Sequence, residues 1–134
     1  MGNHVFFYGT LMAPFNRAGR QRITPNLQFR GRGTIHAALF DLGIYPAAIA
    51  VDDQSIVWGE LYAMKDDAAV LSVLDEIEGY HPGEPDRSLY TRVLTDVSLE
   101  NGDIVKGWTY FYNAPLGQAR RIESGDYLDH LNPR

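Results

Sequence analysis

Short runs in which apolar residues alternate with polar or small ones dominate the chain, and such alternation is typical of half-buried β-strands. Val5–Tyr8 is a compact, β-favouring run closed by Gly9, so it predicts a buried first strand. Arg30–Phe40 predicts a second strand that starts with a glycine kink, and residues 55–64 predict a further one. Between them, residues 42–53 predict a turn beside a short strand. The pattern favours a sheet-rich fold.

A helical period replaces this alternation at Asp66–Glu78. Apolar residues recur there every three or four positions, and the stripe consists of Val70, Leu71, Leu74 and Ile77. An aspartate can cap the start of this helix, and Gly79 can supply the left-handed residue that ends it. Residues 14–23 predict a short polar helix or an ordered loop, and residues 125–131 predict a short helix.

The clearest hairpin signal lies in residues 89–113, where two β-rich runs flank a central Asn-Gly pair. Asn101 and Gly102 suit the positive φ angles of a type I′ turn, so we expect that turn between the two strands. Many strands with one long helix predict an α+β fold with a curled or barrel-like sheet. The length and the absence of linkers or repeats predict a single domain over residues 1–134.

The charge balance disfavours nucleic acid as a partner. The protein has 134 residues, and 12 Lys and Arg against 17 Asp and Glu give it a formal net charge of −5. Basic residues cluster at Arg17–Arg22 and Arg30–Arg32, whereas a nucleic-acid-binding domain presents a broad basic face. No apolar run approaches the ~18 residues that a membrane-spanning helix needs, so we expect no membrane partner.

Cysteine is absent, which excludes thiol catalysis, disulfides and thiolate metal sites, and which fits a reducing compartment. The apolar stretch near the N-terminus is too short for a secretory signal, so we expect a cytoplasmic protein. The histidines do not have the spacing of a zinc site, so we expect no metal. The chain has no glycine spacing typical of a phosphate-binding loop.

Three acids crowd the end of the long helix, where the helix dipole repels negative charge. On a wheel of about 100° per residue with Val70 at zero, Asp75 falls near 140° on the flank and Glu76 near 240° on the polar side. Glu78 falls near 80°, inside the apolar face. A carboxyl held there should have a pKa raised by burial and by like charge, as suits a base near neutral pH. Alternatively, the helix frays after Leu74 and Glu78 reaches water.

Two motifs together resemble the γ-glutamylcyclotransferase-like family. They are FFYGTL at residues 6–11 and LDEIEGY at residues 74–80, and LYTR at 89–92 follows them. YPAA at 45–48 and SGDY at 124–127 extend the resemblance over nearly the whole chain in family order. The Tyr-Gly-Thr-Leu variant is most similar to the γ-glutamylamine cyclotransferase branch.

The resemblance implies a small mixed β-barrel with peripheral helices and a pocket beside the first strand. It also implies a reaction without water, metal or organic cofactor. In that reaction the α-amine of a γ-glutamyl group attacks its own γ-carbonyl, which releases 5-oxoproline and an amine. The family's catalytic carboxylate is the Glu before Gly, which is Glu78 here.

The resemblance further implies that the loop after the first strand cradles the γ-glutamyl group. The expected substrate-binding residues are Tyr8, Gly9, Thr10, Leu11, Tyr90 and Tyr112. Backbone N–H groups of the loop can stabilise charge on the γ-carbonyl oxygen. Tyr90 can either touch the substrate or only pack, and Tyr110 and Tyr112 share a strand face, so one of them can line the pocket.

Two other functions remain open for the same scaffold. One is a domain that binds a small ligand without catalysis, because a fold alone does not determine function. The other is a hydrolase in which Glu78 activates water. A glycosidase pair formed by Glu76 and Glu78 is disfavoured, because residues two apart on a helix point to different sides. The sequence leaves open the identity of the leaving amine and whether the protein is a monomer or a homodimer.

Overall fold

The computed structural model describes residues 3–51 and 53–132. The strands are β1 (His4–Phe7), β2 (Leu27–Asp41), β3 (Pro46–Ala50), β4 (Ile56–Met64), β5 (Tyr90–Leu99), β6 (Ile104–Tyr112) and β7 (Arg120–Arg121). The helices are α1 (Ala18–Gln21), α2 (Asp67–Glu78) and α3 (Tyr127–Leu131), and short 3₁₀ turns lie at Ala13–Phe15, Thr24–Asn26 and Pro85–Arg87.

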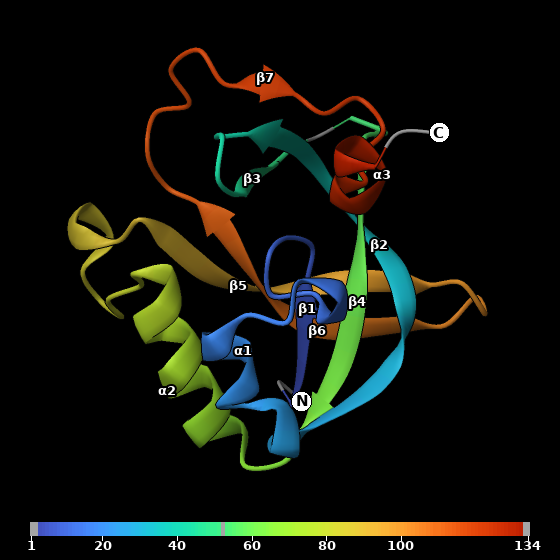
Figure 1. The fold of residues 1–134 in the computed structure, drawn as a ribbon, viewed down its shortest axis with the longest axis vertical. Coiled ribbons are helices and arrows are strands. Elements are labelled where there is room, and N and C mark those ends of the chain that lie inside the picture. The colour runs from blue at the N-terminus through green and yellow to red at the C-terminus, as the bar shows by residue number, and fades with distance from the viewer. Residues whose placement is uncertain (1–2, 52, 133–134) are drawn as a thin grey trace.

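The sheet closes into a mixed barrel, as the resemblance implies. Neighbours around the barrel are β2, β4, β1, β6 and β5, and a β2–β5 pairing closes it (Figure 1). The β1–β6 pair is parallel and the other pairs are antiparallel. At Gly33, where β2 meets β5, a Cβ atom would lie 2.7 Å from the Ser98 carbonyl oxygen, so this closure requires glycine. The far half of β2 leaves the barrel and pairs with β3 and β7.

Strand β1 is buried because it lies in the middle of the strand order, with β4 on one side and β6 on the other. Val5, Phe6 and Phe7 are all buried, which explains why this strand is continuously apolar rather than alternating. Strand β2 shows a register shift between Phe29 and Gly31, at the predicted glycine kink.

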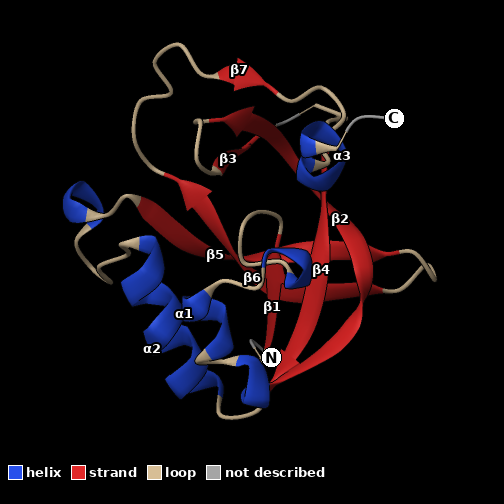
Figure 2. Ribbon diagram, in the orientation of Figure 1, coloured by secondary structure: helices blue, strands red, loops and turns tan. Residues whose placement is uncertain are grey.

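Helix α2 begins at Asp67, one residue after the predicted start, and ends at Glu78 as predicted. The Asp66 side chain caps its start by accepting a hydrogen bond from the Ala69 N–H at 3.3 Å, and Gly79 ends it with a φ of 66°. Val70, Leu71 and Leu74 are buried as predicted, but Ile77 is 38% exposed. The prediction that Ile77 completes the core face is therefore wrong. Figure 2 shows α2 and α1 together beside one flank of the barrel.

The β5–β6 hairpin forms as predicted, with pairs from Tyr90–Tyr112 to Ser98–Ile104. The predicted type I′ turn is wrong, however. The Gly102 N–H donates to the Leu99 carbonyl at 3.0 Å, and within the loop Glu100–Gly102 only Gly102 has a positive φ, of 97°. A three-residue loop of this kind needs a left-handed residue only at its last position.

Candidate active site

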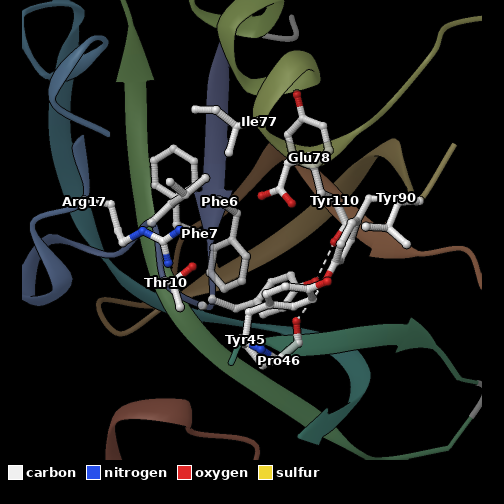
Figure 3. A pocket seen from close by; sticks show the side chains of 14 residues that line it. Phe6, Phe7, Thr10, Arg17, Tyr45, Pro46, Ile77, Glu78, Tyr90 and Tyr110 are labelled. Carbon is white, nitrogen blue, oxygen red and sulfur yellow. Dashed lines mark hydrogen bonds between the residues drawn. The ribbon is translucent and has the colours of Figure 1, made fainter. Parts of the chain in front are cut away.

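A cavity of about 210 Å³ opens beside the end of β1, and Figure 3 shows the side chains that line it. The lining comes from β1 and the loop after it, from α2, and from segments around Pro46, Leu89 and Tyr110. It consists of Phe6, Phe7, Tyr8, Gly9, Thr10, Leu11, Arg17, Tyr45, Pro46, Ile77, Glu78, Leu89, Tyr90 and Tyr110. Apart from Tyr112, every residue predicted for the site from sequence lies in this lining.

The loop after β1 forms a tight turn at the cavity wall, in which the Met12 N–H donates to the Gly9 carbonyl at 3.0 Å. Within the described part of the chain, no atom accepts a hydrogen bond from the backbone N–H of Thr10 or Leu11. A Cβ atom on Gly9 would lie 2.8 Å from Pro46 Cγ, so contact with Pro46 excludes a larger residue there. The loop therefore holds two unpaired backbone donors at the cavity.

The Tyr8 and Tyr90 hydroxyls anchor the walls of the cavity. Tyr8 OH donates to the Tyr110 carbonyl at 2.6 Å and accepts from the Ala48 N–H at 3.2 Å. Tyr90 OH donates to the Pro46 carbonyl at 3.0 Å. Burial, reinforced by the charge of nearby ionisable groups, raises the pKa of both hydroxyls, so they keep their protons. Both tyrosines line the cavity, and their O–H groups donate hydrogen bonds to backbone carbonyl oxygens in its wall.

Tyr112 lies outside the described lining, and its ring packs against Tyr90 with the ring centroids 5.3 Å apart. Tyr110, two residues earlier on the same strand face, lies in the lining instead. Because Tyr112 pairs with Tyr90 at the end of the β5–β6 ladder, it supports a wall from behind. The sequence pattern placed both tyrosines on one strand face. Their positions along β6 decide which of them lines the cavity, because Tyr112 lies at the end of the strand pairing and Tyr110 does not.

Glu78 lies on the cavity side of the last turn of α2, and its carboxylate points toward Phe6 in Figure 3. Burial raises the pKa of this carboxyl to about 7, although the positive charge of Arg17 opposes the rise. The Glu78 side chain is half-buried, and the direction of the pKa shift agrees with the sequence prediction. The predicted contribution of Asp75 and Glu76 is wrong, because like charge is not among the causes of the shift.

Asp75 and Glu76 are each paired with an arginine from another element. Asp75 Oδ1 accepts from Tyr110 OH at 2.6 Å and lies 3.6 Å from Arg92 Nε. Glu76 lies 3.7 Å from Arg22 and its side chain is 70% exposed. Tertiary contacts thus supply the positive charges that the helix sequence lacks, and Glu78 differs from its neighbours by facing the cavity.

Arg17 is the site residue that sequence reasoning missed. The sequence shows a basic cluster at Arg17–Arg22, but the structure sends its members to different places. Arg22 pairs with Glu76, whereas Arg20 Nε donates to the Leu11 carbonyl at 3.1 Å and so braces the loop after β1. Arg17 lines the cavity, and no described carboxylate lies within ion-pair distance of it. No local pattern distinguishes these arginines.

A sequence model of the family described as gamma-glutamyl cyclotransferase, AIG2-like, matches residues 5–129. The chain belongs to this family. The gamma-glutamylcyclotransferase family protein YtfP of Escherichia coli strain K12 is 32% identical over 126 residues, which cover 93% of this chain and 96% of YtfP. Family membership supports a γ-glutamylcyclotransferase-like function.

Solved structures share the barrel of this family member. The solution structure of YtfP from Escherichia coli has a TM-score of 0.65 at 29% identity, over 95% of this chain and 97% of YtfP. An AIG2-like protein from Mus musculus has a TM-score of 0.63 at 26% identity, over 84% of this chain and 80% of the mouse protein. A structure named gamma-glutamyl cyclotransferase, with 16% identity and a TM-score of 0.61, shows the same fold.

The cavity lining contains few charged groups. Of the described lining residues, Glu78 is the one acid and Arg17 the one cation. Within residues 3–51 and 53–132, no group of three His, Cys, Asp or Glu side chains could hold a metal ion. None of the described helices is both long and apolar enough to span a membrane. The cavity therefore offers a carboxyl that can exchange a proton near neutrality, backbone donors and one positive charge.

Proposed function

We propose that the protein is a γ-glutamyl cyclotransferase, which cleaves a γ-glutamyl amide by internal attack and releases 5-oxoproline and an amine without a cofactor. The observation that carries this proposal is Glu78, a single carboxyl with a pKa of about 7 in the same small cavity as the unpaired donors after β1. A general base works best when its pKa is close to the working pH.

The first step requires a neutral α-amine, whose reference pKa is about 8. The Glu78 carboxylate takes one proton from the substrate ammonium, and the nitrogen then attacks the γ-carbonyl carbon. A new N–C bond forms and the carbonyl electron pair moves onto oxygen. The backbone N–H groups of Thr10 and Leu11 donate to that oxygen, because fixed donors stabilise charge that develops in the transition state.

The second step breaks the original amide bond. Glu78 returns its proton to the leaving nitrogen, and the oxygen electron pair re-forms the carbonyl as the C–N bond breaks. The ring nitrogen gives its second proton to the released amine, so the products are 5-oxoproline and an ammonium ion. A single carboxyl that accepts and then donates suffices, provided that its pKa lies near neutrality.

Arg17 is assigned to the substrate α-carboxylate in this proposal. The protein has a net charge of −5, so an anionic substrate needs a local cation, and Arg17 supplies it within the lining. The cavity volume of about 210 Å³ is below the roughly 300–1,000 Å³ typical of drug-sized ligands, and it suits a folded amino-acid-sized group. Holding that group folded supplies much of the rate enhancement, because the attack is intramolecular.

The test is to incubate wild type, Glu78→Gln and Glu76→Gln with a panel of γ-glutamyl amides and to follow the products by mass spectrometry. Wild type should release 5-oxoproline from at least one amide, and Glu78→Gln should be slower by at least ~10²-fold. Glu76→Gln removes the same charge two residues earlier, from a side chain that is 70% exposed, and should keep its activity. Free glutamate would indicate hydrolysis, and no product with any amide would indicate a binding domain. Equal rates for all three proteins would reject the role of Glu78.

A further inference from the structure

Two apolar side chains are left partly uncovered at the cavity. Ile77 is 38% exposed and Leu89 is 40% exposed, and both line the cavity. Ile77 directly precedes Glu78, and the Leu89 N–H donates to the Gly79 carbonyl at 2.9 Å. One chain neighbour of Glu78 is therefore an exposed apolar residue, and the other, Gly79, is hydrogen-bonded to a second one.

Both apolar residues are held in place rather than loosely exposed. A Cβ atom on Gly19 of α1 would lie 2.8 Å from Ile77 Cδ1, so α1 packs closely against one side of Ile77. A Cβ atom on Gly79 would lie 3.4 Å from Leu89 Cβ, so Leu89 is in contact with the end of α2. Ile77 and Leu89 thus each present a fixed, partly exposed apolar side chain to the cavity.

The charges near this surface do not favour a cation. Asp75 and Glu76 are engaged by Tyr110, Arg92 and Arg22, and of the described lining residues only Glu78 is acidic. Arg17 adds a positive charge to the same lining. A second ammonium group on a ligand would find no acid other than Glu78 among the described lining residues.

We propose that Ile77 and Leu89 form the subsite for the leaving amine and select γ-glutamyl amides whose nitrogen carries a neutral, apolar chain. This inference rests on the proposed function. In that function Glu78 must protonate the leaving nitrogen, so the nitrogen lies within hydrogen-bond reach of Glu78. The chain on the leaving nitrogen then begins close to Glu78. Ile77 precedes Glu78, and Leu89 is hydrogen-bonded to Gly79, which follows it, so these two side chains are the ones that the chain meets first. Amides that carry a second ammonium group are disfavoured.

The expected selectivity follows from partial burial of the chain. A fully buried methylene contributes about 0.8 kcal/mol, or about fourfold in an equilibrium constant. Because both side chains remain partly exposed, we expect about twofold in kcat/KM for each added methylene. A terminal ammonium loses that gain and would have to give up part of its hydration beside two apolar side chains, so we expect it to lower kcat/KM on the order of tenfold against an uncharged chain of equal length.

The test compares four γ-glutamyl amides by 5-oxoproline release: the methylamide, the n-pentylamide, the 4-aminobutylamide and the amide of 5-aminopentanoate. The last three have chains of similar length that end in methyl, ammonium and carboxylate. The n-pentylamide should have the highest kcat/KM, and the 4-aminobutylamide should fall about tenfold below it. Equal values for all four, or a preference for either charged chain, would overturn the subsite while leaving the proposed function standing. No 5-oxoproline from any amide would overturn both.

Charge reversal at the subsite gives a second measurement on the same panel. Leu89→Glu places an acid at the mouth, so the ratio of n-pentylamide to 4-aminobutylamide should fall at least fivefold, toward or below one. Ile104→Glu is the matched control, because Ile104 is 68% exposed in the hairpin on the opposite side of the barrel from α2 (Figure 1). An unchanged ratio in Leu89→Glu, with wild-type circular dichroism, would contradict the assignment of Leu89. The wild-type comparison stands on its own should Leu89→Glu fail to fold.

Discussion

The raised pKa of Glu78 predicts a pH-dependent cost to stability that Glu78→Gln should remove. The carboxyl has a pKa of about 7 in the folded protein, against a reference value of 4.5. Between those values the folded state binds more protons than the unfolded state, so the free energy of unfolding falls as the pH rises. Below pH 4.5 the carboxyl is protonated in both states and costs nothing. Above pH 7 it is ionised in both, and the full penalty applies.

The magnitude follows from the size of the shift. One pKa unit corresponds to about 1.4 kcal/mol, so a shift from 4.5 to about 7 lowers the stability of the folded protein by about 3 kcal/mol once Glu78 is ionised. A neutral glutamine carries no such penalty. Relative to wild type, Glu78→Gln should therefore gain about 2.5 kcal/mol of stability between pH 5 and pH 8.

Urea unfolding of both proteins at pH 5 and pH 8 measures this gain, since midpoints and slopes give the free energy of unfolding. Contributions of the substitution that do not depend on pH cancel in the difference between the two pH values. Glu76→Gln controls for the loss of one negative charge at the same helix end, and its difference from wild type should change by less than about 0.5 kcal/mol. A difference for Glu78→Gln that stays constant between pH 5 and pH 8 would refute the burial argument.

Three further substitutions test the site and the helix that carries Glu78. Arg17→Met should raise KM about tenfold or more, because the α-carboxylate loses its cation. It should also move the acidic limb of kcat/KM to higher pH, because Arg17 lowers the pKa of Glu78. Tyr110→Phe removes the 2.6 Å hydrogen bond to Asp75, so it should cost about 1–3 kcal/mol of stability in urea and lower kcat. Asp66→Ala removes the cap of α2 and leaves alanine at a φ of 54°, so the urea midpoint should report a loss of about 2 kcal/mol.

The substitutions at Arg17 and Asp66 have matched controls. Arg17→Lys keeps the charge and should recover part of the lost KM. Arg120→Met, outside the cavity on β7, should leave KM unchanged. Asp66→Gly relieves the left-handed backbone and should be less destabilised than Asp66→Ala. An Arg17→Met protein with wild-type KM and pH profile, or a Tyr110→Phe protein with wild-type stability, would contradict the contacts from which these predictions come.

Elements whose signals lie close together in the chain were predictable. The bounds of α2 follow from Asp66 and Gly79, because a cap and a left-handed end residue act on their own helix. The wheel placed Glu78 on the inner face, and the structure places it in the cavity lining. The fold was predictable in the same way, because two local motifs at Tyr8–Leu11 and Leu74–Tyr80 together resemble one family.

Features that depend on distant partners were not predictable. The hairpin turn depended on the register of β5 against β6, which shortens or lengthens the loop around Asn101 and Gly102 by one residue. Ile77 belongs to the apolar stripe by its angle, but its side chain is 38% exposed and lines the cavity. Local periodicity gives the direction of a side chain and does not say what lies in that direction.

The sequence by itself therefore determined the long helix, the main strands, the family and the single carboxyl on the inner face of α2. Only the tertiary structure decided the electrostatics of the site. Arg92 and Arg22 pair with Asp75 and Glu76, and Arg17 stays within the lining. The physical reason is that helix ends and apolar faces are set by residues a few positions apart, whereas charge pairing and burial depend on which distant segments the closed barrel brings together.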